Sequence, residues 1–439
     1  MKAIKQVLGS NLQQYTMIAV LVILAVGFHL ETGGRMLTPA NAQSLITGNA
    51  YVLIMALGML MVIVIGQIDL SVGSVAGFVG YFVCWLVASH GLNWVLAVIM
   101  GIALGAAIGA WHGFWLARVG IPGFITTLAG MMIFRGALIW LSNSISLAAP
   151  PELAKFGAGY LPEWGPAFTG MNNSTLLLGL LGVAFVAWSQ LNGRRQSLKR
   201  GVEAPMWATI TRIVLLAVVI GYVTWLFGSG RPGTSFPVPG VILLFLVIVY
   251  YFMTERTRFG RHVYAVGGNK AAAALSGVNV KRTYFLTMLN MSFLAALAGI
   301  LFIGRASAAG ANDGNGWELD AIAAVFIGGA AVSGGIGTVM GAMIGGLVMA
   351  VLNSGLTLMG VGSGQTQVIK GLVLLAAVAF DVWNKTQGRP SIIGRLTGGS
   401  KPKAGEPAAV AAAAAASETP GDAGPAVSAG DTMPGTPGL

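Results

Sequence analysis

A single carboxylate, Asp69, interrupts a long apolar part of the chain. Between Gln43 and Ala117 it is the only Asp, Glu, Lys or Arg, and it lies in the stretch Val62–Gly80, which reads VIVIGQIDLSVGSVAGFVG. A carboxylate within a bilayer is costly unless it faces a protein interior or a wet cavity. Asp69 therefore either lines or gates a solute path, or serves only as a helix cap near the membrane boundary.

The residues around this carboxylate indicate a broken helix. Four small residues surround it: Gly66, Ser71, Gly73 and Ser74. Such residues let backbones approach closely and satisfy backbone groups where a membrane helix is interrupted. We expect Asp69 or Ser71 to cap a segment that restarts at Val72, because hydrocarbon cannot satisfy the free amides there.

Other reactive groups form no catalytic or metal-binding set in the sequence. No Gly-x-x-x-x-Gly-Lys-Ser/Thr phosphate loop occurs, so we expect no Walker-type ATPase site. The four histidines are scattered, and His112, between two tryptophans, is expected to be an interfacial side chain. The single cysteine, Cys84, excludes a disulfide framework within the chain and a cysteine-rich metal site. We therefore expect no enzyme activity and no bound metal or cofactor.

The composition indicates which kind of secondary structure must position these residues. Of the 439 residues, 55% are hydrophobic and 9% are charged, whereas about 25% are charged in a soluble domain. Apolar blocks of about 17 to 25 residues, the length that spans a bilayer as a helix, recur along the chain. The sequence predicts an all-α, polytopic membrane bundle of about 10 to 12 hydrophobic segments, some of them broken or re-entrant.

The net charge of +11 is consistent with a membrane protein and does not indicate nucleic-acid binding. The basic residues lie mainly in short loops between apolar blocks, as the positive-inside rule requires. The most basic loop, 253–282, is predicted to be cytoplasmic. The connection 144–172 and the acidic loop 305–320 are predicted to lie outside.

These assignments divide the chain into three parts. Residues 1–14 are expected to be a cytoplasmic N-terminus, and residues 15–384 the transmembrane domain. Residues 385–439 are expected to be a cytoplasmic tail that is disordered from about 401, because a segment rich in Ala, Pro, Gly and Ser buries too little apolar surface to fold.

The chain contains two weakly similar halves. The pattern around Gly66 and Asp69 is echoed by a second candidate break, with Gly328, Gly329, Ser333, Gly334 and Gly335. A single base then interrupts an apolar helix in each half, Arg135 in the first and Lys370 in the second. Paired halves with Gly-interrupted helices are typical of repeat-built transporters, and they point to a pathway near the repeat interface. Chance similarity between glycine-rich helices is the alternative.

The basic loop contains a predicted short helix. Its sequence from Tyr264 to Arg282 is YAVGGNKAAAALSGVNVKR, in which Asn269 is a typical helix cap and Gly277 a typical helix end. A helix over Lys270–Leu275 is marginal alone, so it must dock on something. It is either a linker helix packed on the chain's own bundle or a knob that enters a groove on a cytoplasmic partner.

Four segments together resemble one known family. They are GQIDLSVGS at Gly66–Ser74, GIPGFITTLAGMMIFRG at Gly120–Gly136, YAVGGNKAAAALSGVNV at Tyr264–Val280 and AIAAVFIGGAAVSGGIGTVMGAMIGGLVMAVLNSGL at Ala321–Leu356. In this order, over about residues 15–384, they resemble the permease subunits of bacterial monosaccharide ABC importers, which include ribose, xylose, arabinose and multiple-sugar permeases. The extra loop and span pair around 192–235 is similar to the xylose and multiple-sugar members.

The resemblance implies partners, an energy source and a place in the cell. It implies a multi-pass homodimer in the bacterial cytoplasmic (inner) membrane that imports a monosaccharide such as xylose, arabinose or galactose. A periplasmic sugar-binding protein would dock outside. A double-cassette ATPase that uses ATP and Mg would dock inside. The rival hypothesis is an autonomous secondary sugar transporter or channel, which would need no such partner.

The resemblance also implies which residues couple the permease to the ATPase. The coupling region of the family corresponds to Gly267, Gly268, Asn269, Ala273, Ala274, Ser276 and Gly277. It gives no sugar contact for the motif that contains Asp69.

Overall fold

The computed structural model describes residues 12–386, apart from 167–168, 200, 202–204 and 232. This part of the chain is almost entirely helical. Nine of its helices are long and apolar enough to cross a membrane, and a shorter apolar helix, Thr16–Glu31, precedes them. The predicted all-α polytopic bundle is therefore confirmed. The expectations for residues 1–11 and for the tail from 387 onward, including its disorder, lie outside the described residues.

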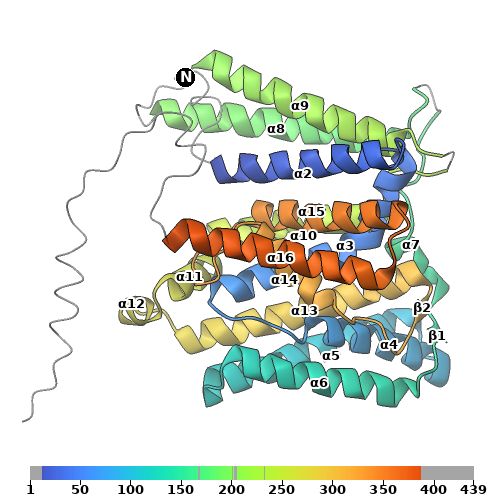
Figure 1. Ribbon diagram of the computed structural model, residues 1–439, viewed down its shortest axis with the longest axis vertical. Helices are drawn as coiled ribbons and strands as arrows, with labels where there is room; N and C mark the ends of the chain where they lie inside the picture. The colour runs from blue at the N-terminus through green and yellow to red at the C-terminus, as the bar shows by residue number, and fades with distance from the viewer. Residues whose placement is uncertain (1–11, 167–168, 200, 202–204, 232, 387–439) are drawn as a thin grey trace, which may run out of the picture. The chain divides into compact units, whose positions relative to one another are not determined.

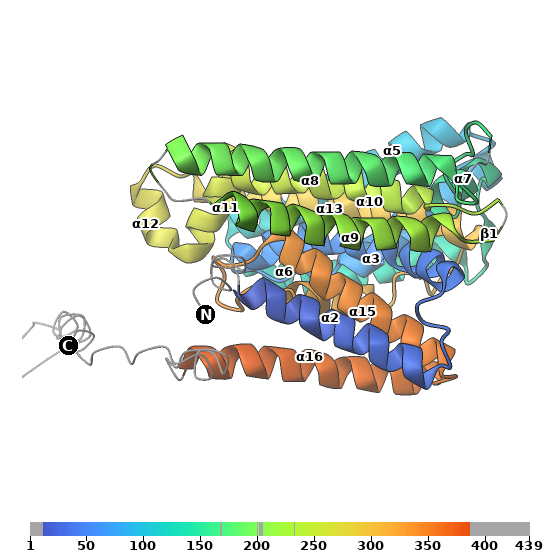
Figure 2. The ribbon, with the colours of Figure 1, turned by 90° about the horizontal axis from the view of Figure 1, so that it is seen from above.

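The elements follow one another along the chain, and Figures 1 and 2 show their arrangement. In order they are α2 (Leu12–Glu31), α3 (Pro39–Val64), α4 (Val72–His90), α5 (Trp94–Phe114), the π-helical turn η1 (Trp115–Val119), α6 (Gly123–Ser142), β1 (Leu147–Ala148), the 3-10 turn η2 (Pro151–Leu153), α7 (Ala154–Gly157), α8 (Asn173–Lys199), α9 (Met206–Gly228), α10 (Val238–Arg256), α11 (Arg258–Gly268), α12 (Lys270–Leu275), α13 (Val280–Ala306), β2 (Ala308–Ala309), α14 (Trp317–Ile327), α15 (Val339–Leu358) and α16 (Ser363–Thr386).

The two ends of the bundle differ. Helices α11 and α12 lie at one end, here called the α12 end, and α7 lies with strands β1 and β2 at the other, here called the ladder end (Figures 1 and 2). The two short strands pair antiparallel, with Leu147 opposite Ala309. Because α12 belongs to the most basic loop, the positive-inside rule predicts that the α12 end faces the cytoplasm.

Helices α3 and α13 form the centre of the bundle. Every residue of α3 from Val52 onward is buried, and α13 packs against α3, α4 and α5. Local sequence sets where α3 begins. The Thr38 hydroxyl accepts a hydrogen bond from the Asn41 N–H at 3.3 Å, and Pro39 occupies the first turn, where its missing N–H costs no helical hydrogen bond.

A row of glycines brings α5 against α13. Four of them recur at every fourth residue, and they are Gly101, Gly105, Gly109 and Gly113. A Cβ added at Gly109 would lie 2.7 Å from the Cα of Leu289 on α13. Small residues at this spacing let membrane helices touch backbone to backbone, which is how helices associate where lipid is as apolar as the side chains.

The helix pair α8 and α9 lies at the edge of the bundle. The two helices pack mainly on each other, and α9 also contacts α3. Only 6% of the most apolar window of α8 and 11% of that of α9 is buried. This pair includes most of the region around 192–235 that the sequence marks as extra, and the central helices do not need it to form their contacts with one another.

The contact between α5 and α13 gives the first testable prediction. Replacing Gly109→Ala forces a methyl group into the Leu289 backbone, so we expect a loss of about 1–3 kcal/mol of stability, typical of overpacking. The matched control is Gly136→Ala in α6, where an added Cβ meets nothing within 4 Å. Thermal unfolding of the detergent-solubilised protein measures both variants. Equal unfolding temperatures for them would contradict the close α5–α13 contact.

Candidate functional site

The first helix break separates α3 from α4, as the sequence predicts. Gly66 has a positive φ of 77°, which a glycine adopts without strain. Asp69 is completely buried, and its Oδ1 accepts hydrogen bonds from the Ser71 N–H at 2.7 Å and the Ser71 hydroxyl at 2.6 Å. The carboxylate therefore fixes the residue just before α4. Ser71 makes no side-chain cap hydrogen bond to the first turn of α4, and the other oxygen of Asp69, Oδ2, is buried without a hydrogen-bond partner among the described residues. The cap interpretation and a role in a solute path both stay predictions.

Helix α6 holds the rest of this break. The Thr127 hydroxyl accepts a hydrogen bond from the Leu70 N–H at 3.1 Å and donates one to the Ile68 carbonyl at 3.1 Å. The Gly123 N–H donates to Gln67 Oε1 at 2.9 Å. Backbone groups that the break removes from helical hydrogen bonds are thus satisfied by the neighbouring helix, as a membrane interior requires.

The second break lies between α14 and α15. Three glycines in it have positive φ: Gly329, Gly334 and Gly335. Gly328 lies against Gly341 of α15, so closely that a Cβ on Gly328 would approach the Gly341 carbonyl carbon to 2.6 Å. Ser333 is exposed.

The two breaks meet. The Gly335 N–H donates a hydrogen bond to the Val64 carbonyl, the last residue of α3, at 2.8 Å. A Cβ on Gly334 would lie 3.1 Å from the Cα of Gly66. Segments that are far apart in the sequence, one in each half, therefore touch through their backbones. The two halves share this contact, and their relation as repeats stays a hypothesis.

The basic loop 253–282, predicted to be cytoplasmic, closes over this junction. Gly267, near the end of α11, lies so close that a Cβ there would overlap the Val64 carbonyl oxygen and lie 2.8 Å from the Gly335 nitrogen. Tyr264 donates from its hydroxyl to the Gly337 carbonyl at 2.7 Å. Burial raises the pKa of Tyr264 to about 12, so its hydroxyl stays a donor at neutral pH. We call the contact of Val64, Gly335 and Gly267 the glycine junction.

The predicted helix of the basic loop is present as α12. Asn269 accepts a hydrogen bond from the Ala272 N–H at 2.9 Å, the helix covers Lys270–Leu275, and Gly277 follows with a φ of 82°. Of the residues carried over from the family, Ala273 is buried, whereas Ala274, Ser276 and Gly277 are exposed. Their role in coupling stays a prediction.

Sequence reasoning missed Leu275. It is the last residue of α12. No neighbouring helix covers its side chain, and 91% of the residue is exposed. The signal was present in the sequence, because Leu275 is the one large apolar residue in the run KAAAAL and has no apolar partner except alanine within the preceding turn. Single exposed apolar side chains are common on protein surfaces, so a contact between Leu275 and a partner protein is a prediction that rests on its place on α12.

Two other candidates, Gly73 and Ser74, are not at the junction. They lie in the first turn of α4, where a Cβ on Gly73 would run into the Glu318 carboxylate and the Gly314 carbonyl. Their neighbours are therefore the loop before α14 and the first turn of α14. Glu318 and Asp320, the last acids of the predicted outside loop 305–320, lie in that first turn and are each only 8% exposed. Most residues between β2 and α14 are exposed or half-buried, and the outside position of this loop stays a prediction.

The expectation that His112 is interfacial is wrong. Its side chain is completely buried, and its ring centroid lies 5.8 Å from that of Phe134. The cause is Gly130 of α6, which has no side chain and therefore lets α6 close over the imidazole, as the overlap of an added Cβ with the ring shows.

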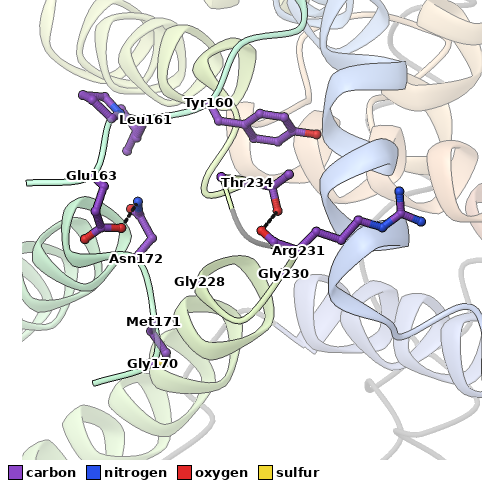
Figure 3. Close-up of a pocket in the computed structure, with 12 residues that line it drawn as sticks. Tyr160, Leu161, Glu163, Gly170, Met171, Asn172, Gly228, Gly230, Arg231 and Thr234 are labelled. Atoms are coloured by element: carbon purple, nitrogen blue, oxygen red, sulfur yellow. Dashed lines mark hydrogen bonds between the residues drawn. The ribbon is translucent and has the colours of Figure 1, made fainter. Parts of the chain in front are cut away.

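A hollow of about 550 Å³ lies at the ladder end, between the connection before α8 and the α9–α10 loop (Figure 3). Its Glu163 carboxylate accepts hydrogen bonds from the Asn172 side chain at 2.6 Å and the Asn173 N–H at 2.9 Å. Glu163 therefore fixes the start of α8. No residue lining this hollow belongs to either break.

These features define a class of protein: a polytopic helical membrane protein with two broken helices that meet under the basic loop. The chain belongs to the family described as the permease component of branched-chain amino acid transport systems, which matches residues 41–378. It is thus a permease component in the cytoplasmic membrane and not an enzyme. No solved structure matches the chain.

Curated relatives agree with the predicted resemblance to monosaccharide permeases. The xylose transport system permease protein of Escherichia coli strain K12 is 38% identical over 376 residues, which cover 84% of this chain and 92% of the relative. That of Haemophilus influenzae is 37% identical over 377 residues, covering 85% and 97%. The ribose import permease protein of E. coli K12 is 33% identical over 376 residues, covering 86% and 95%.

The glycine junction gives the second prediction. Gly267→Ala should displace α11 from the Val64 carbonyl, lowering the unfolding temperature by several degrees and reducing transport. Gly27→Ala in α2 is its control, since an added Cβ there also meets nothing within 4 Å and the position belongs to neither break nor to the predicted coupling region. Thermal unfolding in detergent and solute uptake in cells measure the pair. If Gly267→Ala behaved like Gly27→Ala in both assays, the junction would have no structural importance.

Proposed function

We propose that this chain is the membrane subunit of an ATP-driven importer of a monosaccharide. The observation that carries the proposal is the glycine junction, where a cytoplasmic helix pair contacts the helix breaks of both halves. The xylose and ribose permeases among its relatives support a sugar as the solute. The family description names branched-chain amino acids, so the two solute classes need a direct comparison.

The coupling step follows from how α12 is attached. Its base is continuous with α11, which ends at the junction, and Lys270 lies 5.5 Å from the centroid of the Tyr284 ring on α13, a distance suited to cation–π attraction. A partner that moves α12 must therefore move α11, and with it the contact between the breaks. The partner would be a cytoplasmic double-cassette ATPase that uses ATP and Mg, and its state would shift the permease between two conformations.

The remaining partners complete the transport cycle. A second copy of the chain would form the other side of the path, and a periplasmic sugar-binding protein would deliver the sugar at the ladder end. Selectivity and affinity would reside mainly in that binding protein. The path itself then needs only weak sugar contacts.

The substrate experiment uses vesicles that contain the permease, its ATPase and its binding protein. We expect ATP-dependent uptake of radiolabelled xylose or a related monosaccharide and no uptake of leucine. Uptake of leucine instead of sugar would show that the transported solute is an amino acid and not a monosaccharide. Vesicles with the permease alone test the rival hypothesis of an autonomous transporter, because sugar uptake by them on a proton or sodium gradient would refute the importer proposal.

A third prediction concerns Leu275. Leu275→Asp should weaken the association with the ATPase at least about fivefold, since loss of a central apolar contact at an interface costs more than about 1 kcal/mol. Its stability should not change, because the side chain is exposed. The measurement is co-purification of the ATPase with tagged permease.

The matched control for Leu275 is Ile145→Asp. Ile145 is also exposed, at 59%, but it lies just before β1 at the ladder end. It should leave ATPase association unchanged. Unchanged co-purification by Leu275→Asp would remove α12 as the docking element, and equal losses in both variants would show a nonspecific effect.

A further inference from the structure

A second hollow, of about 610 Å³, lies at the α12 end where α5 and η1 meet the start of α13. It is lined by three basic side chains, two aromatic ones and one amide: Arg118, Lys281, Arg282, Phe114, Phe285 and Asn279. We call it the basic pocket. None of its three bases forms an ion pair with an acid in the described part of the chain.

Local backbone structure positions the bases. Arg118 lies in η1, where the Gly120 and Ile121 N–H groups both donate to the Trp115 carbonyl, at 3.0 and 3.1 Å. A π-helical turn inserted after an α-helix changes the direction of its side chains and is frequent at functional sites. On the opposite side, Asn279 accepts a hydrogen bond from the Arg282 N–H at 2.9 Å, which fixes the first turn of α13.

The pocket continues an apolar stripe on α5. Its members recur at helical spacing and are exposed: Leu96, Ile99, Ala103, Ala107, Trp111 and Phe114. The next position on this face, one turn beyond Phe114, is Arg118. The face opposite the stripe is the glycine row that packs on α13. The stripe is thus available to lipid, and it leads directly to unpaired positive charge at the predicted cytoplasmic boundary.

We propose that the basic pocket binds the phosphate headgroup of an anionic glycerophospholipid of the cytoplasmic leaflet. Basic pockets between membrane helices on this side suit such headgroups. The apolar stripe of α5 would hold the acyl chains, and Phe114 would mark the depth at which headgroup and chain meet. An acidic protein surface would complement the positive charges but would leave the apolar stripe uncovered. The lipid complements both the charges and the stripe.

The site adjoins α12. Tyr284, between Arg282 and Phe285 on α13, has Lys270 of α12 over its ring, 5.5 Å from the ring centroid. A lipid that holds the first turn of α13 therefore also steadies α12. The bound lipid would favour one conformation of the permease, whatever solute it transports.

The test uses the full-length protein in detergent and native mass spectrometry to count bound lipids. Wild-type protein should retain phosphatidylglycerol in preference to phosphatidylcholine. The variant Arg118→Gln/Lys281→Gln/Arg282→Gln should bind phosphatidylglycerol about a hundredfold more weakly, since each base near an anionic lipid contributes a several-fold gain. The single variant Lys281→Gln, at an exposed position, should weaken binding several-fold and serves if the triple variant fails to fold.

The matched control removes three bases elsewhere at the same end. Arg256→Gln/Arg258→Gln/Arg261→Gln makes the same change in charge on exposed residues of α10 and α11, and it should keep the bound lipid. An equal loss in this control would show general surface attraction and overturn the proposal.

Two further outcomes would also overturn it. Inorganic phosphate that displaces phosphatidylglycerol at equal concentration would assign the pocket to a free anion. A pocket variant that retains the lipid but no longer co-purifies with the ATPase would assign the pocket to an acidic surface of that partner. The results of both measurements do not depend on which sugar, if any, the protein transports.

Discussion

The hydrogen bond from the Gly335 N–H to the Val64 carbonyl is the contact on which the arrangement of the helices depends. A helix that ends inside a membrane leaves carbonyl groups that neither lipid nor water can satisfy, so another backbone must approach them. That approach needs residues without side chains. The requirement explains why glycines gather on three segments that are distant in sequence, since a Cβ at Gly267 or Gly335 would meet backbone atoms of a neighbouring segment.

The same constraint links a cytoplasmic element to the interior of the bundle. Backbone contacts through glycine have almost no freedom to adjust, because there is no side chain that can change rotamer. A displacement of α11 is therefore transmitted to both breaks and is not absorbed by them. Packed interfaces of this kind switch between discrete arrangements more readily than they deform continuously. In the proposed coupling, a partner would contact α12 at the exposed Leu275, and its movement would reach the breaks through α11.

Local features could be predicted from the sequence, because their causes are local. The cap at Asn269, the helix over Lys270–Leu275 and the interruption after Gly66 follow from side-chain chemistry within a few residues. The contact between the two breaks could not be derived in this way, since no local rule states which distant glycine faces Val64. The burial of His112 was missed for a related reason, because it depends on the absence of a side chain at Gly130 on another helix.

The two lone bases, Arg135 and Lys370, show how the halves share one element. Arg135 donates to the Asp313 carbonyl at 2.9 Å, and Lys370 lies 2.6 Å from Asp320. Arg135 of α6 thus holds the loop before α14, and Lys370 of α16 holds the first turn of α14 itself. An ion pair with little solvent exposure adds little net stability but fixes a register, because leaving either partner alone is costly. Helix α14 is in this way held at its start, while the second break at its far end contacts α11. If α12 moved, the two breaks would therefore move relative to the start of α14, which stays in place. Such a fixed point lets a movement at one end of the bundle change the contact between the breaks.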